Sequence, residues 1–212
     1  MDFRLLDRPS RRGLQSGGTA LKGLSMKGMF ARGIRAAKFD RTVYAEVAAR
    51  PDLVLNSLGI VILAGFATIF GYLNIWYAGR DVPPLLDDLG GRALGLWLAV
   101  LTMLVGWIIW AGIAVLMGKI FMHGGGSFRD VLRVLGICYL PGVLFMFSSI
   151  PGVGNFIGLA AQLWILFAGA IAMHEVQKSD WIGAALGTLV GWFVGVVIVP
   201  YVVIDTFVSV AP

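Results

Sequence analysis

Five long apolar stretches dominate this 212-residue chain and limit what it can fold into. They run about 57–77, 93–122, 131–150, 152–173 and 182–204. A helix needs roughly 20 predominantly apolar residues to cross the hydrocarbon core of a bilayer, so each stretch is long enough to span it. The whole chain is 58% hydrophobic and only 14% charged, whereas a soluble domain has about 25% charged residues. These figures exclude a disordered chain, a disulfide-stapled secreted module and an ordinary cytosolic enzyme. They predict an all-α, polytopic bundle of five transmembrane helices.

The third and fourth stretches allow two interpretations. A Pro-Gly pair at Pro151-Gly152 separates them and predicts a turn between two full spans. The alternative is a re-entrant hairpin over 131–173, which would leave three full spans.

The distribution of Lys and Arg predicts the orientation of the chain. Residues 1–56 hold 11 basic and 5 acidic groups, and the segment 119–133 is also basic, whereas the loop 78–92 is acidic. Basic segments remain on the cytoplasmic side of a membrane. We therefore expect a cytoplasmic N-terminus and, with five spans, a C-terminus on the other side.

Residues 1–38 predict a flexible, basic cytoplasmic arm. Cations alternate there with glycines, and the apolar residues of Ala20–Phe39 scatter around a helical wheel. Gly23, Gly28 and Gly33 each weaken a helix by roughly 1 kcal/mol relative to Ala. We therefore expect no clean amphipathic helix in this arm. Its expected partner is a bilayer with anionic headgroups, which attracts each cation by about 1 kcal/mol.

Residues 39–56 predict a short interfacial helix on the cytoplasmic face. Asp40 is a suitable N-cap, and an apolar stripe follows it at helical spacing. The stripe consists of Val43, Tyr44, Val47 and Ala48. Glu46 and Arg50 are spaced as an i,i+4 ion pair, and Pro51 should end or kink the helix.

Small residues and one proline mark expected packing features inside the membrane. Glycines recur every fourth residue in the fifth stretch: Gly183, Gly187, Gly191 and Gly195. Such a stripe lets helix backbones approach closely in lipid, against either the second helix of this chain or another protomer. Gly154 and Gly158 form a shorter version in the fourth stretch, and Pro141 predicts a kink in the third.

A glycine-rich loop before the third stretch suggests lipid-headgroup contacts. Ser127 follows three glycines and, with Asp130 three residues later, resembles a capping box. A helix N-terminus of this kind can bind phosphate, so Ser127, Arg129 and Arg133 are candidate headgroup contacts. Arg133 lies about one turn inside the helix and is expected to extend toward the cytoplasmic interface.

The residues needed for catalysis or metal binding do not form a recognisable pattern. His174-Glu175 is followed by Lys178 where a zinc protease would have its second histidine. His123 and Cys138 stand on different elements without further ligands. We therefore expect no enzyme activity, no cofactor, no metal and no nucleic-acid partner. The two histidines are interpreted as side chains at the membrane interface.

The third and fourth stretches resemble the core of the Yip domain family of five-helix membrane proteins, named for interaction with Ypt/Rab GTPases. The resemblance lies in the order Ser127-Phe128, Gly136, Tyr139 and Pro141, then Pro151, Gly154 and Trp164, and it covers roughly Arg35 to Ile204. It implies five spans, a cytoplasmic N-terminus and a part in membrane shaping or trafficking. The short, basic N-terminus lacks the long acidic domain of eukaryotic members, so Rab binding is not carried over. The upstream segment from Arg35 is similar to prokaryotic members, which implies the plasma membrane of a prokaryote.

Three functions remain open from the sequence. The first is a non-enzymatic scaffold or membrane-organising protein that acts through lipid, a membrane-protein partner or a second copy of itself. The second is a small transporter or permease-associated subunit with a thin polar lining that includes Gln162 and Thr188. The third is a lipid-modifying enzyme that uses His174 and Glu175. Ionisable residues inside the membrane usually mark transport or catalysis, and their scarcity favours the first.

Overall fold

The computed structural model describes residues 25–77, 89–121, 125–200 and 202–203. The described residues are helical or lie in short connections, and five segments are long and apolar enough to span a membrane. The prediction of an all-α bundle with five such helices is confirmed.

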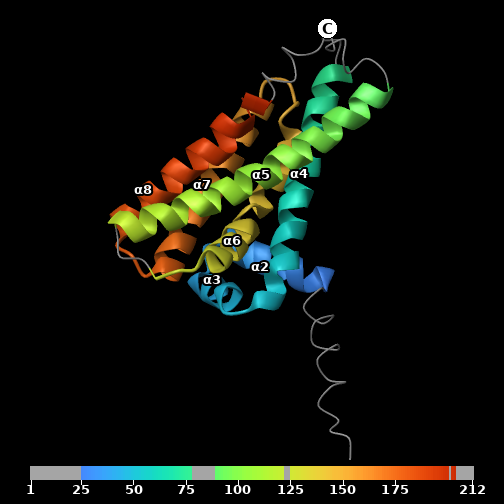
Figure 1. Cartoon of the computed structure of the whole chain (residues 1–212). Coiled ribbons are helices and arrows are strands. Elements are labelled where there is room, and N and C mark those ends of the chain that lie inside the picture. Colours follow the sequence, from blue (N-terminus) through green and yellow to red (C-terminus); the bar gives the residue numbers. More distant parts are fainter. Residues whose placement is uncertain (1–24, 78–88, 122–124, 201, 204–212) are drawn as a thin grey trace, which may run out of the picture.

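Two short helices precede the bundle. α2 covers Met26–Ala37 and α3 covers Arg41–Ala48. A 3₁₀ turn, η2 (Pro51–Leu53), leads into the first span, α4 (Val54–Tyr77). Figure 1 shows α2 and α3 beside each other at one end of the bundle. Below, residues 26–48 are called the α2–α3 unit.

The remaining four spans follow with two irregular segments. α5 covers Leu89–Phe121 and α6 covers Phe128–Cys138. A 3₁₀-helix, η4 (Leu140–Phe147), completes the third span, and α7 (Gly154–Gln177) forms the fourth. α8 (Trp181–Trp192) continues into a π-helical segment, η5 (Phe193–Ile198), which ends at the opposite end of the bundle from α3 (Figure 1).

The change from α6 to η4 falls at Pro141, where the sequence predicts a kink. The α-helix ends at Cys138, and Leu140 and Pro141 open the tighter 3₁₀ segment. Proline cannot donate the α-helical hydrogen bond and clashes with the preceding turn. A change of helix type therefore takes the place of a simple bend.

Two tryptophans of α5 tie the middle of the bundle together. Trp110 is fully buried and packs edge-on against Tyr139, with ring centroids 5.6 Å apart. Its Nε1 donates to the carbonyl oxygen of Thr188 at 3.1 Å, and Trp107 Nε1 donates to that of Leu132 at 3.0 Å. Each indole thus satisfies its polar atom on a neighbouring helix, as buried tryptophans usually do.

The N-terminal helix α2 corrects one expectation. The sequence predicts no amphipathic helix across Ala20–Phe39, yet Met26–Ala37 is helical, with Gly33 and Ala36 buried. A Cβ on Gly33 would lie 2.9 Å from Leu140 Cδ2 and 3.2 Å from Ile60 Cδ1. The glycine that weakens the isolated helix therefore lets α2 pack closely on α4 and η4. Residues 1–24 of the expected arm lie outside the described residues.

Candidate functional site

Most charged side chains of the described chain gather where α2 and α3 meet the bundle. Glu46 of α3 bridges two arginines of α2. Its Oε1 lies 3.0 Å from Arg32 Nε, and its Oε2 lies 2.7 Å from Arg35 Nη1. The expected pair of Glu46 with Arg50 does not form, because Arg50 instead binds Asp52 at 2.6 Å. The charges of α3 are thus used to hold α2 in place.

Asp40 lies at the turn between α2 and α3 and begins α3 as predicted. Its carboxylate accepts hydrogen bonds from the Thr42 backbone N–H at 3.0 Å and from the Thr42 hydroxyl at 2.7 Å. Arg35 Nε donates to its other oxygen at 2.7 Å. The hydrogen bonds from Thr42 first, and then that from Arg35, lower the pKa of Asp40 to about 2. The folded chain therefore favours the charged form of the Asp40 carboxylate.

We expect acid to open this turn. The pKa of Asp40 is lower in the folded chain than the usual value of about 3.9. Its contribution to stability is therefore complete above about pH 4 and is lost as the pH falls toward 2. An NMR titration of the Asp40 side-chain ¹³C signal should give a midpoint well below that of a free aspartate. In an Asp40→Asn variant the α2–α3 turn should show little change over the same pH range, whereas an ordinary midpoint for Asp40 would contradict the cap.

Arg133 of α6 is the most deeply buried charge at this end. Its Nη2 donates to the Ala48 carbonyl oxygen at 2.6 Å and lies 2.5 Å from Asp130 Oδ1. Its Nε donates to the Val47 carbonyl oxygen at 3.3 Å. These carbonyls belong to the last turn of α3, where the α-helical hydrogen bonds run out and the negative end of the helix dipole lies. The Val47 carbonyl also accepts from the Arg50 backbone N–H at 3.3 Å.

The expected extension of Arg133 toward lipid headgroups is therefore wrong. The residue is only 5% exposed, and its guanidinium caps the C-terminus of α3. The Arg133 backbone also takes part, since its carbonyl oxygen accepts a 2.6 Å hydrogen bond from Ser57 Oγ of α4. One residue thus joins α3, α4 and α6.

Two aromatic side chains fix the end of α2. Tyr44 OH donates to the Ala36 carbonyl oxygen at 2.8 Å, and Trp164 Nε1 donates to that of Ala37 at 2.8 Å. Tyr44 is fully buried, whereas Trp164 of α7 is 40% exposed. Burial raises the pKa of the Tyr44 hydroxyl, so it remains a neutral donor. The stripe of α3 thus faces protein, with Val43, Tyr44 and Val47 fully buried.

His174 lies at the turn between α7 and α8. Its ring stacks on Trp181 with centroids 4.0 Å apart, and the Arg41 guanidinium lies 5.1 Å from the Trp181 ring centroid. His174 Nδ1 lies 2.7 Å from the Ser179 carbonyl oxygen, which can only accept, so Nδ1 carries the proton. Arg41 also lies 3.7 Å from Glu175. These contacts join the start of α3 to the α7–α8 turn.

Of the candidate headgroup residues, Ser127 and Arg129 remain at the surface. Ser127 Oγ accepts from the Asp130 backbone N–H and the Asp130 side chain accepts from the Ser127 backbone N–H, so the predicted capping box is confirmed. Arg129 is exposed and makes no ion pair within the described chain. Only Arg129 of the three therefore keeps its side chain free for an external group.

The four glycines of α8 and η5 are all buried within the chain. A Cβ atom on Gly195 would overlap the backbone carbonyl of Gly106 in α5. A Cβ atom on Gly106 would likewise overlap the carbonyl of Gly195. A Cβ on Gly191 would lie 2.6 Å from Trp110 Cδ1. Gly191 and Gly195 therefore pack against α5 of the same chain, which is one of the two partners that the sequence left open. Gly183 and Gly187 belong to the same stripe.

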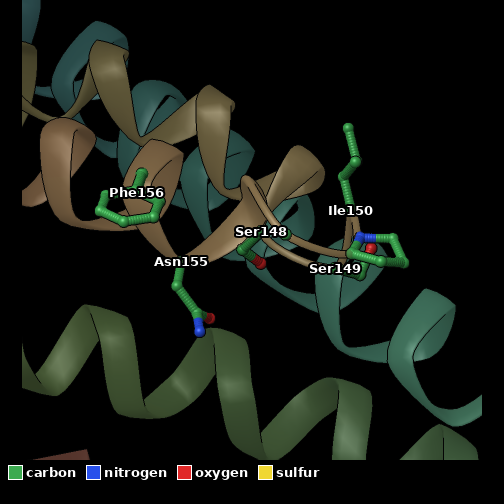
Figure 2. Close-up of a pocket in the computed structure, with 7 residues that line it drawn as sticks. Ser148, Ser149, Ile150, Asn155 and Phe156 are labelled. Atoms are coloured by element: carbon green, nitrogen blue, oxygen red, sulfur yellow. The ribbon is translucent and has the colours of Figure 1, made fainter.

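The shorter pair, Gly154 and Gly158, has a different place. A Cβ on Gly154 would overlap the Ser148 carbonyl of the preceding turn, and a Cβ on Gly158 would meet only Ser148 Cβ at 3.8 Å. A Cβ on Gly154 would also lie 3.1 Å from the Phe147 carbonyl oxygen, at the end of η4. The expectation that this pair forms a helix–helix face stays a prediction. The η4–α7 connection and the first turn of α7 line a hollow of about 200 Å³ at the far end of the bundle (Figure 2). None of its seven lining residues, which include Ser148, Ser149 and Asn155, is ionisable.

The contacts of the α2–α3 unit were largely missed from the sequence. Arg32 and Arg35 were counted only as spaced cations, although the i,i+3 spacing places both on one face of α2. This spacing, followed by the acidic and apolar residues of α3, could have indicated that the two helices pair. Among the described residues no three His, Cys, Asp or Glu side chains could hold a metal ion, and His123 lies outside these residues.

Comparison with known proteins gives one match. The family model described as the Yip1 domain matches residues 34–204, which include α3, all five spans and the C-terminal part of α2. No curated protein and no solved structure matches the chain. Because the match covers most of its length, this integral membrane protein belongs to the Yip1 domain family.

Proposed function

We propose that this chain is a non-enzymatic, membrane-organising protein that uses the α2–α3 unit as a wedge in one leaflet. The observation that carries the proposal is the position of α2 beside the spanning helices rather than beyond their ends. α2 contacts Ile60 of α4, Leu140 of η4 and Trp164 of α7.

These contacts give the depth of α2 along the bundle. Ile60 lies six residues from the start of α4, or about 9 Å at 1.5 Å per residue. Met29 of α2 lies against Gly59, which is five residues from the same end, or about 8 Å. One half of the hydrocarbon core is about 15 Å thick. α2 thus overlaps the depth of one leaflet and widens the protein there.

An amphipathic helix that occupies one leaflet adds area to that leaflet alone, and its binding is sensitive to curvature. The charges near α2 support a structural use, because Glu46, Asp40 and Arg133 each bind a neighbouring element of the same chain. We place the α2–α3 unit on the cytoplasmic side, in the plasma membrane of a prokaryote. This placement follows the basic residues 1–56 and the resemblance to prokaryotic family members.

Reconstitution into vesicles tests the proposal. With increasing amounts of the full chain, vesicles imaged by cryo-electron microscopy should become smaller or tubular. In a Gly33→Leu variant the larger side chain would push α2 away from Leu140 and Ile60, so vesicle shape should return toward that of protein-free vesicles.

The matched control is Gly28→Leu in the same helix. A Cβ at Gly28 would lie 3.0 Å from Arg32 Nη1, the flexible end of a side chain, so α2 should stay in place. This variant should deform vesicles like the natural chain. If the natural chain is monodisperse and helical but leaves vesicles spherical at every protein content, the proposal is wrong.

A second candidate, a small transporter or permease-associated subunit, is favoured by one observation. Gln162 Oε1, Thr188 Oγ1 and Trp192 Nε1 are buried in α7 and α8 without a hydrogen-bond partner. Polar atoms inside a membrane protein can face a substrate path. A solute flux through these vesicles that is lost in a Gln162→Leu, Thr188→Val variant would favour transport over the wedge.

A further inference from the structure

The charges at the α3 end of the bundle do not balance. The described residues there include ten Lys or Arg and six Asp or Glu. Every one of the six carboxylates already binds a cation or a backbone N–H of the described chain: Asp40, Glu46, Asp52, Asp130, Glu175 and Asp180. The protein therefore offers no further carboxylate there, within the residues described, to the remaining cations.

Four cations at this end have no ion pair or hydrogen bond in the described part of the chain: Lys27, Lys38, Lys119 and Arg129. Two of them are exposed at α2: Lys27 lies in its first turn, and Lys38 is its C-cap residue. An exposed cation inside or beside a membrane is stabilised by an anion, and the most abundant anions at this level are lipid phosphates.

The outer face of α2 has the pattern of a lipid contact. Lys27, Ala31, Ile34 and Lys38 follow at i, i+4, i+7 and i+11, which places them on one side of the helix, and all four are exposed. Ile34 is 47% exposed, and the opposite side carries the buried Gly33 and Ala36. The apolar centre of this face is flanked by two lysines whose stems can extend toward headgroups.

We propose that this outer face of α2 (Lys27, Ala31, Ile34 and Lys38) binds anionic phospholipid. Each lysine ammonium takes a lipid phosphate, and Ile34 lies against the acyl chains. The two lysines are 11 residues apart, or about 16 Å along the helix, so they bind separate headgroups. This proposal rests on the placement of α2 in the leaflet made under the proposed function, and it adds the chemical class of the lipid.

Lipid binding by the purified full chain tests it. The chain is placed in nanodiscs of phosphatidylcholine and titrated with spin-labelled phosphatidylglycerol, whose immobilised fraction is measured by electron paramagnetic resonance. A Lys27→Gln, Lys38→Gln variant should bind this lipid roughly thirtyfold more weakly, since each cation near the surface contributes to the affinity. Raising the salt concentration should weaken binding to the natural chain.

A Lys119→Gln, Lys178→Gln variant is the matched control, because it removes the same charge from other elements of the same end. It should retain most of the affinity. An equal loss in both variants would assign binding to general surface charge and overturn the α2 site. Equal binding of spin-labelled phosphatidylcholine, or complete displacement of the labelled lipid by inorganic phosphate, would overturn the proposal as well.

The lipid measurement is separable from the vesicle-shape measurement. If vesicles deform normally but the Lys27→Gln, Lys38→Gln variant binds the anionic lipid unchanged, the lipid site is wrong and the wedge stands. If lipid binding falls as expected in a chain that never deforms vesicles, the lipid site stands and the wedge is wrong.

Discussion

Replacement of Arg133 by leucine is expected to lower the free energy of unfolding by about 3–5 kcal/mol. The substitution leaves the Ala48 carbonyl without its side-chain donor, the Val47 carbonyl with the Arg50 backbone N–H alone, and the Asp130 carboxylate without its cation. Each buried acceptor left unsatisfied costs about 1–3 kcal/mol. The α2–α3 unit should also detach first, because Arg133 is its main polar attachment to α6.

Two measurements separate global stability from detachment. Denaturant titration of the chain in detergent gives the free energy of unfolding, and limited proteolysis reports on the accessibility of residues 26–48. The control is Arg50→Leu, which removes a partly exposed ion pair with Asp52 and should cost less than about 1 kcal/mol. Arg133→Lys should fall between the two, because an ammonium cannot match the planar donors of the guanidinium. If Arg133→Leu is as stable and as protease-resistant as Arg50→Leu, the capping role is wrong.

The five spans were predictable because their signal is local. A run of roughly 20 apolar residues has few alternatives to a membrane helix, and Pro151-Gly152 marked a turn that the structure places at residues 148–153. The cap at Asp40 and the capping box at Ser127 were predictable for the same reason, since donor and acceptor lie within three residues of each other.

The features that were missed depend on partners far along the chain. Arg133 lies 85 residues from Ala48, and its hydrogen bond to that carbonyl cannot be recognised from the sequence around either residue. Gly33 was interpreted from helix propensity alone. Its structural role is to leave space for the side chains of Leu140 and Ile60, which pack against α2. Glu46 had three candidate partners: Arg32 and Arg35 in α2, and Arg50 four residues later in the chain. The packing of α3 on α2 brings the first two to Glu46.

Irregular helix geometry was also beyond the sequence. Pro141 predicted a disturbance in the third span, but not that eight residues from Leu140 to Phe147 would become 3₁₀. The π-helical segment Phe193–Ile198 follows no proline, and it coincides with the place where Gly195 meets Gly106. Such segments arise from the fit between two helices, which the sequence of one helix does not contain.

The contact between Gly106 and Gly195 leads to the second large expected effect. Gly195→Ala should lower the free energy of unfolding by about 3 kcal/mol, because the new Cβ would overlap the Gly106 carbonyl and force α5 and η5 apart. Gly158→Ala is the matched control in α7. Its Cβ would have one neighbour, Ser148 Cβ at 3.8 Å, so the variant should stay within about 1 kcal/mol of the natural chain.

The reciprocal substitution makes this prediction sharper. Gly106→Ala should cost about as much as Gly195→Ala, because its Cβ would overlap the Gly195 carbonyl. The double variant should cost clearly less than the sum, since helices already separated by the first methyl accommodate the second. Denaturant titration of the four chains in detergent measures this coupling. Additive costs would mean that the two glycines do not share one contact, and a neutral Gly195→Ala would show that α5 and η5 do not pack through these glycines.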